Sequence, residues 1–409
     1  MSVIVQKYGG SSVADVQKIG HVADRVVAAK REGHDVVVVV SAMGKSTDEL
    51  IGLARRAAET AGPGAEPPRR ELDMLVSTGE RVTMALLSIA IQARGHDAIS
   101  FTGSQSGILT NDRHFDARII EVRPHRIQDE LARGRIVIVA GYQGMSYKRE
   151  ITTLGRGGSD TTAVALAAAL DAERCEIYSD VDGVYSADPR VVPDPKHLPE
   201  MDLAMLGEMA EAGAKVINAQ AVEWARRSKI AIHARKTADP VGGGRQTVAN
   251  DARASDEGEI ARVEDENRNV RAIVGIAGVM VARVAASSLP SFLRTAADEE
   301  LSVGDVLETG VDAYVHIPLL NVPDWQRCAR AIERALGDSV TFLGKRAVVS
   351  VVGYGLTGTS GALPRVYDCL ARVEAQPVCV SAGPLRISVT IEEAKLGEAQ
   401  RAMHEAFVD

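Results

Sequence analysis

The chain contains 409 residues, of which 45% are hydrophobic, 25% are charged and only 4% are aromatic, and its net charge is −8. This composition is typical of a globular protein with two or three domains, and the acidic balance without a dense basic cluster argues against nucleic-acid binding. No apolar run reaches the length of a membrane span, no signal-peptide pattern is present, and the four scattered cysteines are typical of a reducing compartment. We therefore expect a cytoplasmic protein that binds neither nucleic acid nor membrane.

A short apolar strand is expected at Val3–Tyr8, and a turn with two glycines follows it. Lys7 lies at the end of this strand, and Gly9 and Gly10 precede a helical pattern that continues to about Arg31. A lysine beside glycine backbone is suited to bind phosphate groups, although an ordinary tight turn explains the same residues.

The run Val36–Val40 has the β-branched composition of a strand that is buried on both faces of a parallel sheet. The polar loop 41–48 follows it, at the sheet edge where open α/β sheets bind ligands. Leu72–Arg94 forms one long helical pattern that is interrupted at residues 77–80. Glu80, in this interruption, is either a site residue or a solvated helix carboxylate.

The segment 152–162 connects the strand expected at Ile136–Ala140 with a helix expected at Ala163–Leu170. Three glycines surround Arg156, and Asp160 stands at a helix N-cap position together with Ser159. The free N–H groups and partial positive charge expected at the helix N-terminus favour an anion. One cation beside one anion suits a zwitterion such as a free amino acid, but a glycine-rich turn with a capping aspartate is the alternative.

Further strands are expected at Ile99–Phe101 and Cys175–Tyr178, and a helix is expected at Met201–Trp224. Strands that alternate with helices predict an α/β fold with a parallel sheet. The loop after the last of these strands carries Asp180 and Asp182, whose spacing does not fit an EF-hand, so we interpret it as a turn.

A glycine-rich break at Pro240–Asn250 and an acidic stretch after it predict a domain boundary between residues 240 and 268. We expect a first domain at residues 1–250, a linker at 251–269 and a C-terminal region at 270–409. Strands are expected there at Val270–Ile276, Met280–Ala285, Ala313–Leu319, Ala347–Val352 and Arg386–Ile391, and helices at 363–373 and Leu396–Phe407. This order indicates two small βαββαβ units.

Several of these loops, in this order, resemble the aspartate kinases of the amino-acid kinase superfamily over about residues 1–215. The motifs that carry the resemblance are Lys7 to Val13, Ser41 to Leu50, Ser77 to Glu80, Ser100 to Gly103, Thr153 to Thr162, Ser179 to Arg190 and Gly213 to Val216. The resemblance implies an amino-acid kinase αβα sandwich with a mainly parallel sheet. The tail looks like two α+β, ferredoxin-like ACT units, at about 280–342 and 343–409, which are contiguous or interleaved.

The activity that the resemblance implies is the phosphorylation of the side-chain carboxylate of L-aspartate by ATP with Mg²⁺, which gives 4-phospho-L-aspartate. Such a carboxylate is already ionised at neutral pH, so the reaction needs no general base, and phosphoryl transfer depends on positioning and charge neutralisation.

The site residues follow from the matched motifs. The catalytic residues implied are Lys7, Arg156 and Asp160. The residues implied to bind aspartate are Ser41, Thr47, Glu80, Arg156, Gly157, Gly158, Ser159 and Asp160. The residues implied to bind the nucleotide are Lys7, Tyr8, Gly9, Gly10, Ser179, Asp180, Tyr185, Arg190 and Lys215. No protein ligand is expected for the metal, because Mg²⁺ is carried by phosphate oxygens and water.

The sequence departs from the family after Lys215, where the usual Leu-His-Pro-Arg is replaced by Ile217-Asn218-Ala219-Gln220. Segments that contact inhibitory amino acids in the family are also replaced, at 286–291, 301–309 and 380–385. We therefore expect weak or atypical feedback inhibition by lysine or threonine. ACT-type units commonly associate, so a homodimer or larger homo-oligomer is expected.

Two other functions stay open from the sequence. One is an amino-acid kinase with a different carboxylate substrate, which the changes after Lys215 suggest. The other is a non-catalytic protein that binds an amino acid for regulation, which decayed ATP loops would favour. The ATP loops are intact.

Overall fold

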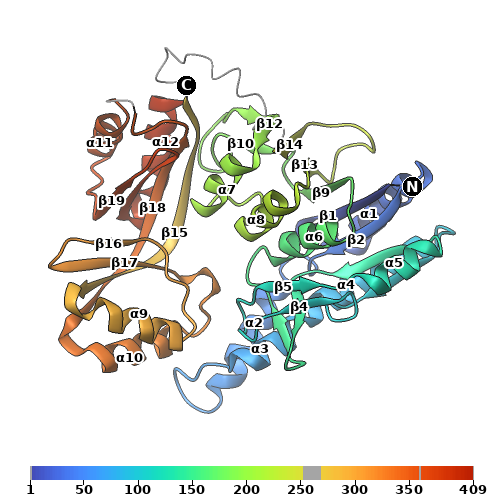
Figure 1. Cartoon of the computed structure of the whole chain (residues 1–409), viewed down its shortest axis with the longest axis horizontal. Helices are drawn as coiled ribbons and strands as arrows, with labels where there is room; N and C mark the ends of the chain where they lie inside the picture. Colours follow the sequence, from blue (N-terminus) through green and yellow to red (C-terminus); the bar gives the residue numbers. More distant parts are fainter. Residues whose placement is uncertain (1, 252–268, 359–360, 409) are drawn as a thin grey trace. The chain divides into compact units, whose positions relative to one another are not determined.

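The computed structural model describes residues 2–251, 269–358 and 361–408 (Figure 1). The chain divides into two compact units. As far as the structure describes them, the first comprises residues 1–184, 198–207 and 215–255, and the second comprises residues 185–197, 208–214 and 256–409. The expected linker at 251–269 lies almost entirely outside the described residues, so the expected domain limits stay a prediction.

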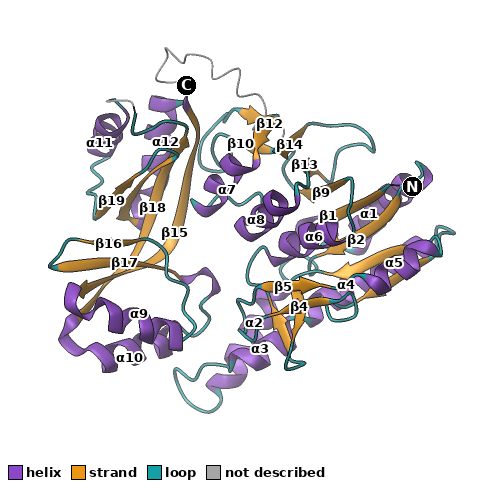
Figure 2. Ribbon diagram, viewed as in Figure 1, coloured by secondary structure: helices purple, strands orange, loops and turns teal. Residues whose placement is uncertain are grey.

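The first unit is built on an eight-stranded sheet (Figure 2). Its spatial order is β12 (Glu200–Asp202), β14 (Gln246–Asn250), β13 (Ile232–Lys236), β9 (Arg174–Ser179), β1 (Val3–Tyr8), β2 (Asp35–Val40), β6 (Ile136–Ala140) and β3 (Ala98–Phe101). The pair β13–β14 is antiparallel, and the other paired strands are parallel. The expected strands at 3–8, 36–40, 99–101, 136–140 and 175–178 are therefore confirmed.

Helices cover both faces of this sheet, which confirms the mainly parallel α/β sandwich. The helices of the unit are η1 (Gly10–Val13), α1 (Val16–Arg31), α2 (Ser46–Glu59), α3 (Arg69–Val76), α4 (Thr78–Gln92), α5 (His125–Ala132), α6 (Gly158–Ala169) and α8 (Ala219–Ser228). On one face, α1 and α4 pack over alternate residues of the central strands, including Ile4, Tyr8, Val38 and Ile138. On the other face, α6 packs over β1, β2 and β9 and contacts α8. Since side chains alternate along a strand, Lys7 points to the α6 face.

A second, four-stranded sheet belongs to the same unit. Its order is β5 (Ile119–Val122), β4 (Ile108–Thr110), β7 (Gln143–Ser146) and β8 (Ile151–Thr153). Helix α3 packs against β8, the strand that leads directly into the Arg156 loop. The sequence patterns did not predict this sheet, because its strands are short and irregular.

One helical stretch within the described residues, Arg69–Gln92, has the length and hydropathy of a membrane span. It consists of α3 and α4, which are separated only at Ser77, so the interruption expected at residues 77–80 is confirmed at its first residue alone. Both helices pack within the first unit, and they carry the buried carboxylates of Asp73 and Glu80. Since carboxylates are costly in a bilayer, we interpret the stretch as a pair of core helices.

The prediction of one helix at Met201–Trp224 is wrong in part. The chain forms β12, then α7 (Leu203–Glu211), and resumes as α8 only at Ala219. Gly213 has φ +103, a conformation that ends a right-handed helix. The two-stranded sheet of β10 (Val184–Tyr185) and β11 (His197–Leu198) precedes these elements.

The second unit contains a six-stranded antiparallel sheet. Its order is β16 (Val306–Glu308), β17 (Asp312–Pro318), β15 (Val270–Ala285), β18 (Val340–Gly353), β20 (Arg386–Glu392) and β19 (Cys379–Ala382). Its longer helices are α9 (Leu289–Asp298), α10 (Trp325–Leu336), α11 (Ala362–Arg372) and α12 (Leu396–Phe407), and short 3-10 turns lie at Ala286–Ser288, Leu319–Asn321, Gly337–Ser339 and Glu393–Lys395.

Strand β15 corrects the expectation of two separate strands at 270–276 and 280–285. It pairs with β18 on both sides of a register shift between Ile276 and Val279, where Gly278 has φ +72. Its first half packs in one core with α11, α12 and β20, and its second half packs in another core with α9, α10 and β17. The two small α/β halves are therefore interleaved, because one strand serves both.

Candidate functional site

Four neighbouring parallel strands, β9, β1, β2 and β6, end at the same sheet edge. Tyr8 at the end of β1 lies in register with Val40 of β2 and Tyr178 of β9, and Val40 lies in register with Ala140 of β6. The loops after β1, β2 and β9 carry many of the site residues expected from the sequence, and parallel topology brings these three loops to one sheet edge. The Arg156 loop instead follows β8 of the four-stranded sheet, because β7 and β8 lie between β6 and this loop. The direct connection that we expected from the strand at 136–140 to segment 152–162 is therefore wrong.

Two of these loops and the start of α4 are packed too closely for larger side chains at their glycines. A Cβ on Gly10 would lie 2.9 Å from the Ala42 carbonyl oxygen, and a Cβ on Gly79 would lie 2.8 Å from the Ala42 Cβ. The Gly44 N–H also donates to the Gly10 carbonyl at 3.0 Å. The first loop, the loop after β2 and the start of α4 thus form one rigid assembly.

An ion pair joins β1 to α6 at this edge. Lys7 Nζ lies 2.6 Å from Asp160 Oδ1, and the two side chains are only 11% and 7% exposed. The Lys7 Nζ also lies 3.5 Å from the position of a Cβ on Gly9. We expected Lys7 and Asp160 in one site from the sequence, and the structure places their charged groups in direct contact.

The start of α6 differs from the expectation in one respect. Helix α6 begins at Gly158, and its N-cap is Gly157, whose φ of +79 favours glycine. Ser159 and Asp160 therefore lie in the first helical turn rather than at the cap. The N–H groups of Gly158 and Asp160 bond to carbonyls of the preceding turn, so they are not the free donors we expected.

Glu80 lies in the first turn of α4 and is 3% exposed, which excludes the solvated carboxylate that the sequence left open. Its Oε1 accepts a hydrogen bond from the Ala42 N–H at 3.0 Å. Its Oε2 is buried, and no hydrogen-bond partner for it is found in the described part of the chain. Burial raises the pKa of Glu80 from 4.5 to about 7. A buried carboxylate oxygen without a partner is suited to accept from a substrate ammonium.

Arg156 is half-exposed on the loop before α6. Its guanidinium Nη2 lies 2.7 Å from Asp48 Oδ1 in the first turn of α2, close in sequence to Thr47. Because both partners are more than half exposed, the pair is weak enough to exchange for a substrate carboxylate. Ser41 follows β2 directly, and its N–H donates to the Tyr8 carbonyl at 3.1 Å.

The residues expected to bind the nucleotide are only partly brought together. The ring of Tyr8 is wholly buried and stacks on Tyr178 at 4.8 Å, so it lies in the core and cannot face a nucleotide. The Gly9 N–H donates to the Tyr178 carbonyl at 3.1 Å and is not free for phosphate. These two observations correct our expectation for the Tyr8 side chain and the Gly9 amide.

Of the other residues expected to bind the nucleotide, Ser179 lies at this sheet edge, and the rest are distributed over the two units. Ser179 ends β9 and bonds through its hydroxyl to the Val181 backbone, while Asp180 and Lys215 are exposed in the first unit. Tyr185 and Arg190 belong to the second unit, where the Tyr185 ring packs against His197. The structure thus places neither Tyr185 nor Arg190 relative to the sheet edge.

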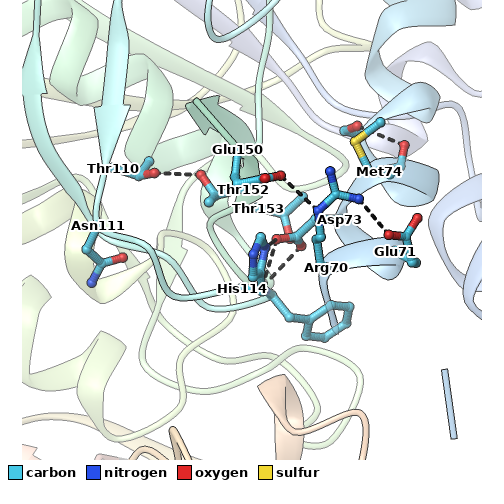
Figure 3. A network of polar contacts seen from close by, with 12 residues as sticks. Arg70, Glu71, Asp73, Met74, Thr110, Asn111, His114, Glu150, Thr152 and Thr153 are labelled. Atoms are coloured by element: carbon cyan, nitrogen blue, oxygen red, sulfur yellow. Dashed lines mark hydrogen bonds and ion pairs between the residues drawn. The ribbon is translucent and has the colours of Figure 1, made fainter. Parts of the chain in front are cut away.

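Asp73 is a buried residue that the sequence analysis missed. In Figure 3, His114 and Thr153 both point toward its carboxylate. It is 0% exposed and accepts hydrogen bonds from Thr153 Oγ1 at 2.5 Å, from the Phe115 N–H at 3.1 Å and from His114, whose Nδ1 lies at 2.7 Å. Burial raises the pKa of Asp73, and these hydrogen bonds lower it in part.

This carboxylate joins the helix before Glu80 to the strand before Arg156. Asp73 lies on α3, which a single residue separates from α4, and Thr153 is the last residue of β8. The signal that could have revealed Asp73 is an acidic residue on the apolar face of α3, next to Leu72 and Val76.

No group of three or more histidine, cysteine, aspartate or glutamate side chains suited to a metal ion occurs among the residues that the structure describes. The free cysteines Cys175, Cys328, Cys369 and Cys379 are all buried. Burial raises the pKa of the Cys175 thiol, as is typical of an unreactive core residue.

Comparisons with known proteins agree with this fold. The amino acid kinase family model matches residues 2–235, and an ACT domain model matches residues 349–407. The first match covers more than half of the sequence, so the chain belongs to the amino acid kinase family.

Within that family, its relatives are aspartokinases. The chain is 41% identical over 424 residues to the aspartokinase of Mycolicibacterium smegmatis, with 100% of this chain and 96% of the relative covered. It is 38% identical over 416 residues to aspartokinase 2 of Bacillus subtilis, with 100% and 98% covered.

Solved structures show the same fold. The structure of E. coli aspartokinase III in complex with aspartate and ADP has a TM-score of 0.83 at 24% identity, and the match covers 100% of both chains. The aspartate kinase of Synechocystis has a TM-score of 0.53 at 34% identity, with 99% of this chain and 69% of that chain covered.

Proposed function

We propose that this protein is an aspartate kinase, which transfers the γ-phosphoryl group of ATP to the side-chain carboxylate of L-aspartate and forms 4-phospho-L-aspartate. The observation that carries the proposal is the nearly buried Lys7–Asp160 ion pair at the carboxyl edge of β1. In this proposal, Lys7 is the cation that faces the transferring phosphoryl group, and Asp160 beside it is the anion that binds the substrate ammonium. The names of the full-length relatives support aspartate as the substrate.

Aspartate binding uses the charges on the first unit. Arg156 releases Asp48 and pairs with the substrate α-carboxylate, since the guanidinium fork matches a carboxylate. Glu80 Oε2 and Asp160 accept from the ammonium, which supplies the hydrogen bond that Oε2 lacks. Ser41 and Thr47 orient the side-chain carboxylate, and the loop of Gly157, Gly158 and Ser159 closes the pocket around it.

The chemical step needs no proton transfer. An oxygen of the ionised side-chain carboxylate attacks the γ-phosphorus of ATP, the bond from that phosphorus to the β–γ bridging oxygen breaks, and ADP leaves with the electron pair. Lys7 stabilises the charge on the transferring group, and Gly10 allows the loop backbone to lie close to the phosphates. Asp160 holds the Lys7 ammonium in place.

The nucleotide and the metal enter together as Mg-ATP. Mg²⁺ bound to phosphate oxygens and water neutralises the triphosphate and needs no group of protein carboxylates. Ser179, Asp180 and Lys215 of the first unit line the nucleotide side in this proposal. The roles of Tyr185 and Arg190 stay predictions from the resemblance.

Regulation and assembly belong to the second unit. We propose weak or atypical feedback inhibition, because the segments expected to contact an inhibitory amino acid are replaced by other residues at 286–291, 301–309 and 380–385. We also propose a homodimer or larger homo-oligomer that forms through the ACT-type region, in the cytoplasm.

An assay that traps the acyl phosphate tests this function. Purified protein is incubated with Mg-ATP and L-aspartate in hydroxylamine, and the hydroxamate is measured alone and with lysine, threonine or both. Hydroxamate that forms and persists with both amino acids agrees with an unregulated aspartate kinase. A fall at sub-millimolar lysine or threonine contradicts the proposed lack of feedback, and no hydroxamate with aspartate contradicts the function.

The same assay tests the alternative substrate. Glutamate and other acidic amino acids replace aspartate at equal concentration, and the changes after Lys215 motivate this comparison. A higher rate with any of them than with aspartate would replace aspartate as the proposed substrate.

A further inference from the structure

Asn218 lies where the sequence departs from the family pattern after Lys215, and the structure gives it three partners. Its Oδ1 accepts from the Gln220 N–H at 2.8 Å, which caps the N-terminus of α8. The same oxygen accepts from the Thr161 hydroxyl in the first turn of α6 at 3.2 Å. Its Nδ2 donates to the Arg156 carbonyl at 3.0 Å. A single amide therefore joins α8, α6 and the Arg156 loop.

The orientation of this amide follows from its partners. A backbone N–H can only donate, so the atom that faces Gln220 must be the oxygen, and a carbonyl can only accept, so the atom that faces Arg156 must be the nitrogen. A side chain with only acceptors or only donors cannot make all three hydrogen bonds. Asn218 therefore meets a specific chemical requirement at this position.

Asn218 also packs directly against the turn that begins α6. A Cβ on Gly157 would lie 2.8 Å from Asn218 Nδ2, and Gly157 has φ +79. The flat amide thus covers the α-carbon of Gly157, whose backbone conformation only glycine adopts without strain. The backbone on both sides of the Arg156–Gly157 peptide is held by the same side chain.

We propose that Asn218 is a positioning residue for aspartate recognition. Its Nδ2 fixes the Arg156 carbonyl, and its Oδ1 fixes Thr161, the residue after Asp160. It thereby sets the spacing between the cation that receives the substrate α-carboxylate and the anion that receives the ammonium. This inference rests on the proposed function of Arg156 and Asp160.

The variant Asn218→Asp separates the two functions of the side chain. Aspartate keeps the oxygen that caps α8 and accepts from Thr161, and it is as good an N-cap as asparagine. It replaces the donor to the Arg156 carbonyl by a second oxygen, which cannot donate. We expect a melting temperature close to that of the parent, a KM for aspartate raised about tenfold and a KM for ATP within about twofold.

Two further measurements distinguish positioning from loss of stability. Asn218→Ala removes both functions, so it lowers the melting temperature and raises the KM for aspartate. Asp15→Ala is the matched control, because Asp15 caps α1 through the Lys18 N–H at 2.8 Å without contact to the Arg156 loop. It should lower the melting temperature and leave the KM for aspartate unchanged.

Binding of L-aspartate, measured by calorimetry without nucleotide, gives a readout that does not depend on turnover. The Kd of Asn218→Asp should rise about tenfold with the KM. A parent that binds and phosphorylates aspartate while Asn218→Asp keeps the parental Kd and KM overturns this inference alone. A rise of equal size in the KM for ATP also overturns it. A parent that neither binds nor phosphorylates aspartate overturns the proposed function and this inference together.

Discussion

Lys7 Nζ and Asp160 Oδ1 lie 2.6 Å apart, and this contact joins the central strand β1 to the helix that begins after the Arg156 loop. Both side chains are nearly buried, so each charge depends on the other for its stabilisation. The pair fixes the ammonium group of Lys7 at the sheet edge, where the phosphoryl group is proposed to be transferred.

Lys7→Met should lower kcat about 100-fold or more, because the cation that stabilises the transferring group is lost. The KM for aspartate should change much less, since Lys7 is not proposed to bind aspartate. Steady-state kinetics with both substrates varied measures the two effects.

The matched control for this prediction is Lys30→Met. Lys30 Nζ forms a similar ion pair with Asp35 Oδ1 at 2.8 Å, but at the start of β2 and thus at the opposite edge of the sheet. This variant should keep the parental kcat. A Lys7→Met protein with unchanged turnover would refute the proposed role of Lys7.

The raised pKa of Glu80 predicts that aspartate binding depends on pH. Its pKa is about 7 in the folded protein because of burial, and a substrate ammonium binds the ionised form. The affinity for aspartate should therefore rise with pH up to about 7, and binding near this pH should release a proton. Calorimetry in buffers of different ionisation enthalpy measures the proton, and Glu80→Gln should release none from this site.

The same residue predicts a pH-dependent stability. Because the folded-state pKa lies above the unfolded value of 4.5, the folded protein binds the Glu80 proton more tightly than the unfolded chain does. The stability of the parent relative to Glu80→Gln should therefore fall by about 3 kcal/mol as the pH rises from about 4.5 to about 7. Urea unfolding of both proteins across this range measures the difference, and parallel curves would exclude the raised pKa.

Arg156→Ala should raise the KM for aspartate about 100-fold or more, because the substrate α-carboxylate loses its charged partner. Asp48→Ala is the informative companion variant, since it removes an ion-pair partner that Arg156 has without substrate and leaves Arg156 itself in place. An exposed ion pair contributes up to about 1 kcal/mol, so this KM should stay equal or fall by up to about fivefold. Near-normal aspartate saturation in Arg156→Ala would contradict the assignment.

Asp73→Ala should destabilise the protein by about 3 kcal/mol or more. The substitution leaves the Thr153 hydroxyl and the Phe115 N–H buried without their acceptor (Figure 3). Glu71→Ala, on the same helix, is the control, because the exposed Glu71 bonds only to the neighbouring Arg70 among the contacts described and should change stability by less than about 0.5 kcal/mol. Chemical unfolding of the three proteins gives the comparison, and equal effects of the two substitutions would show that the Asp73 network is not a stabilising core element.

Sequence patterns alone were enough to locate several loops of the site. Lys7, the loop after β2 and the Arg156 loop could be located because polar or glycine residues next to an apolar strand or helix form a local pattern, although β8, the strand before Arg156, was not predicted. The order of such patterns also determined the α/β class, since parallel strands need helical crossovers.

Helix limits were predicted less well. We placed the N-cap of α6 at Ser159 and Asp160, whereas the helix begins at Gly158 after a left-handed Gly157. The sequence pattern did not distinguish these cap positions, because aspartate and serine are also good N-caps and the contact of Gly157 with Asn218 is a tertiary one.

Which charged and polar groups meet depends on the assembled fold. The Lys7–Asp160 pair, the Ala42–Glu80 hydrogen bond, the Asp73 network and the hydrogen bonds from Asn218 to Thr161 and Arg156 all join residues far apart in the sequence. The periodicity of apolar residues indicates which face of a helix or strand is buried. It does not indicate which buried polar groups contact one another. Buried polar groups must find partners wherever the fold places them, so these contacts appear only once the strands and helices have assembled.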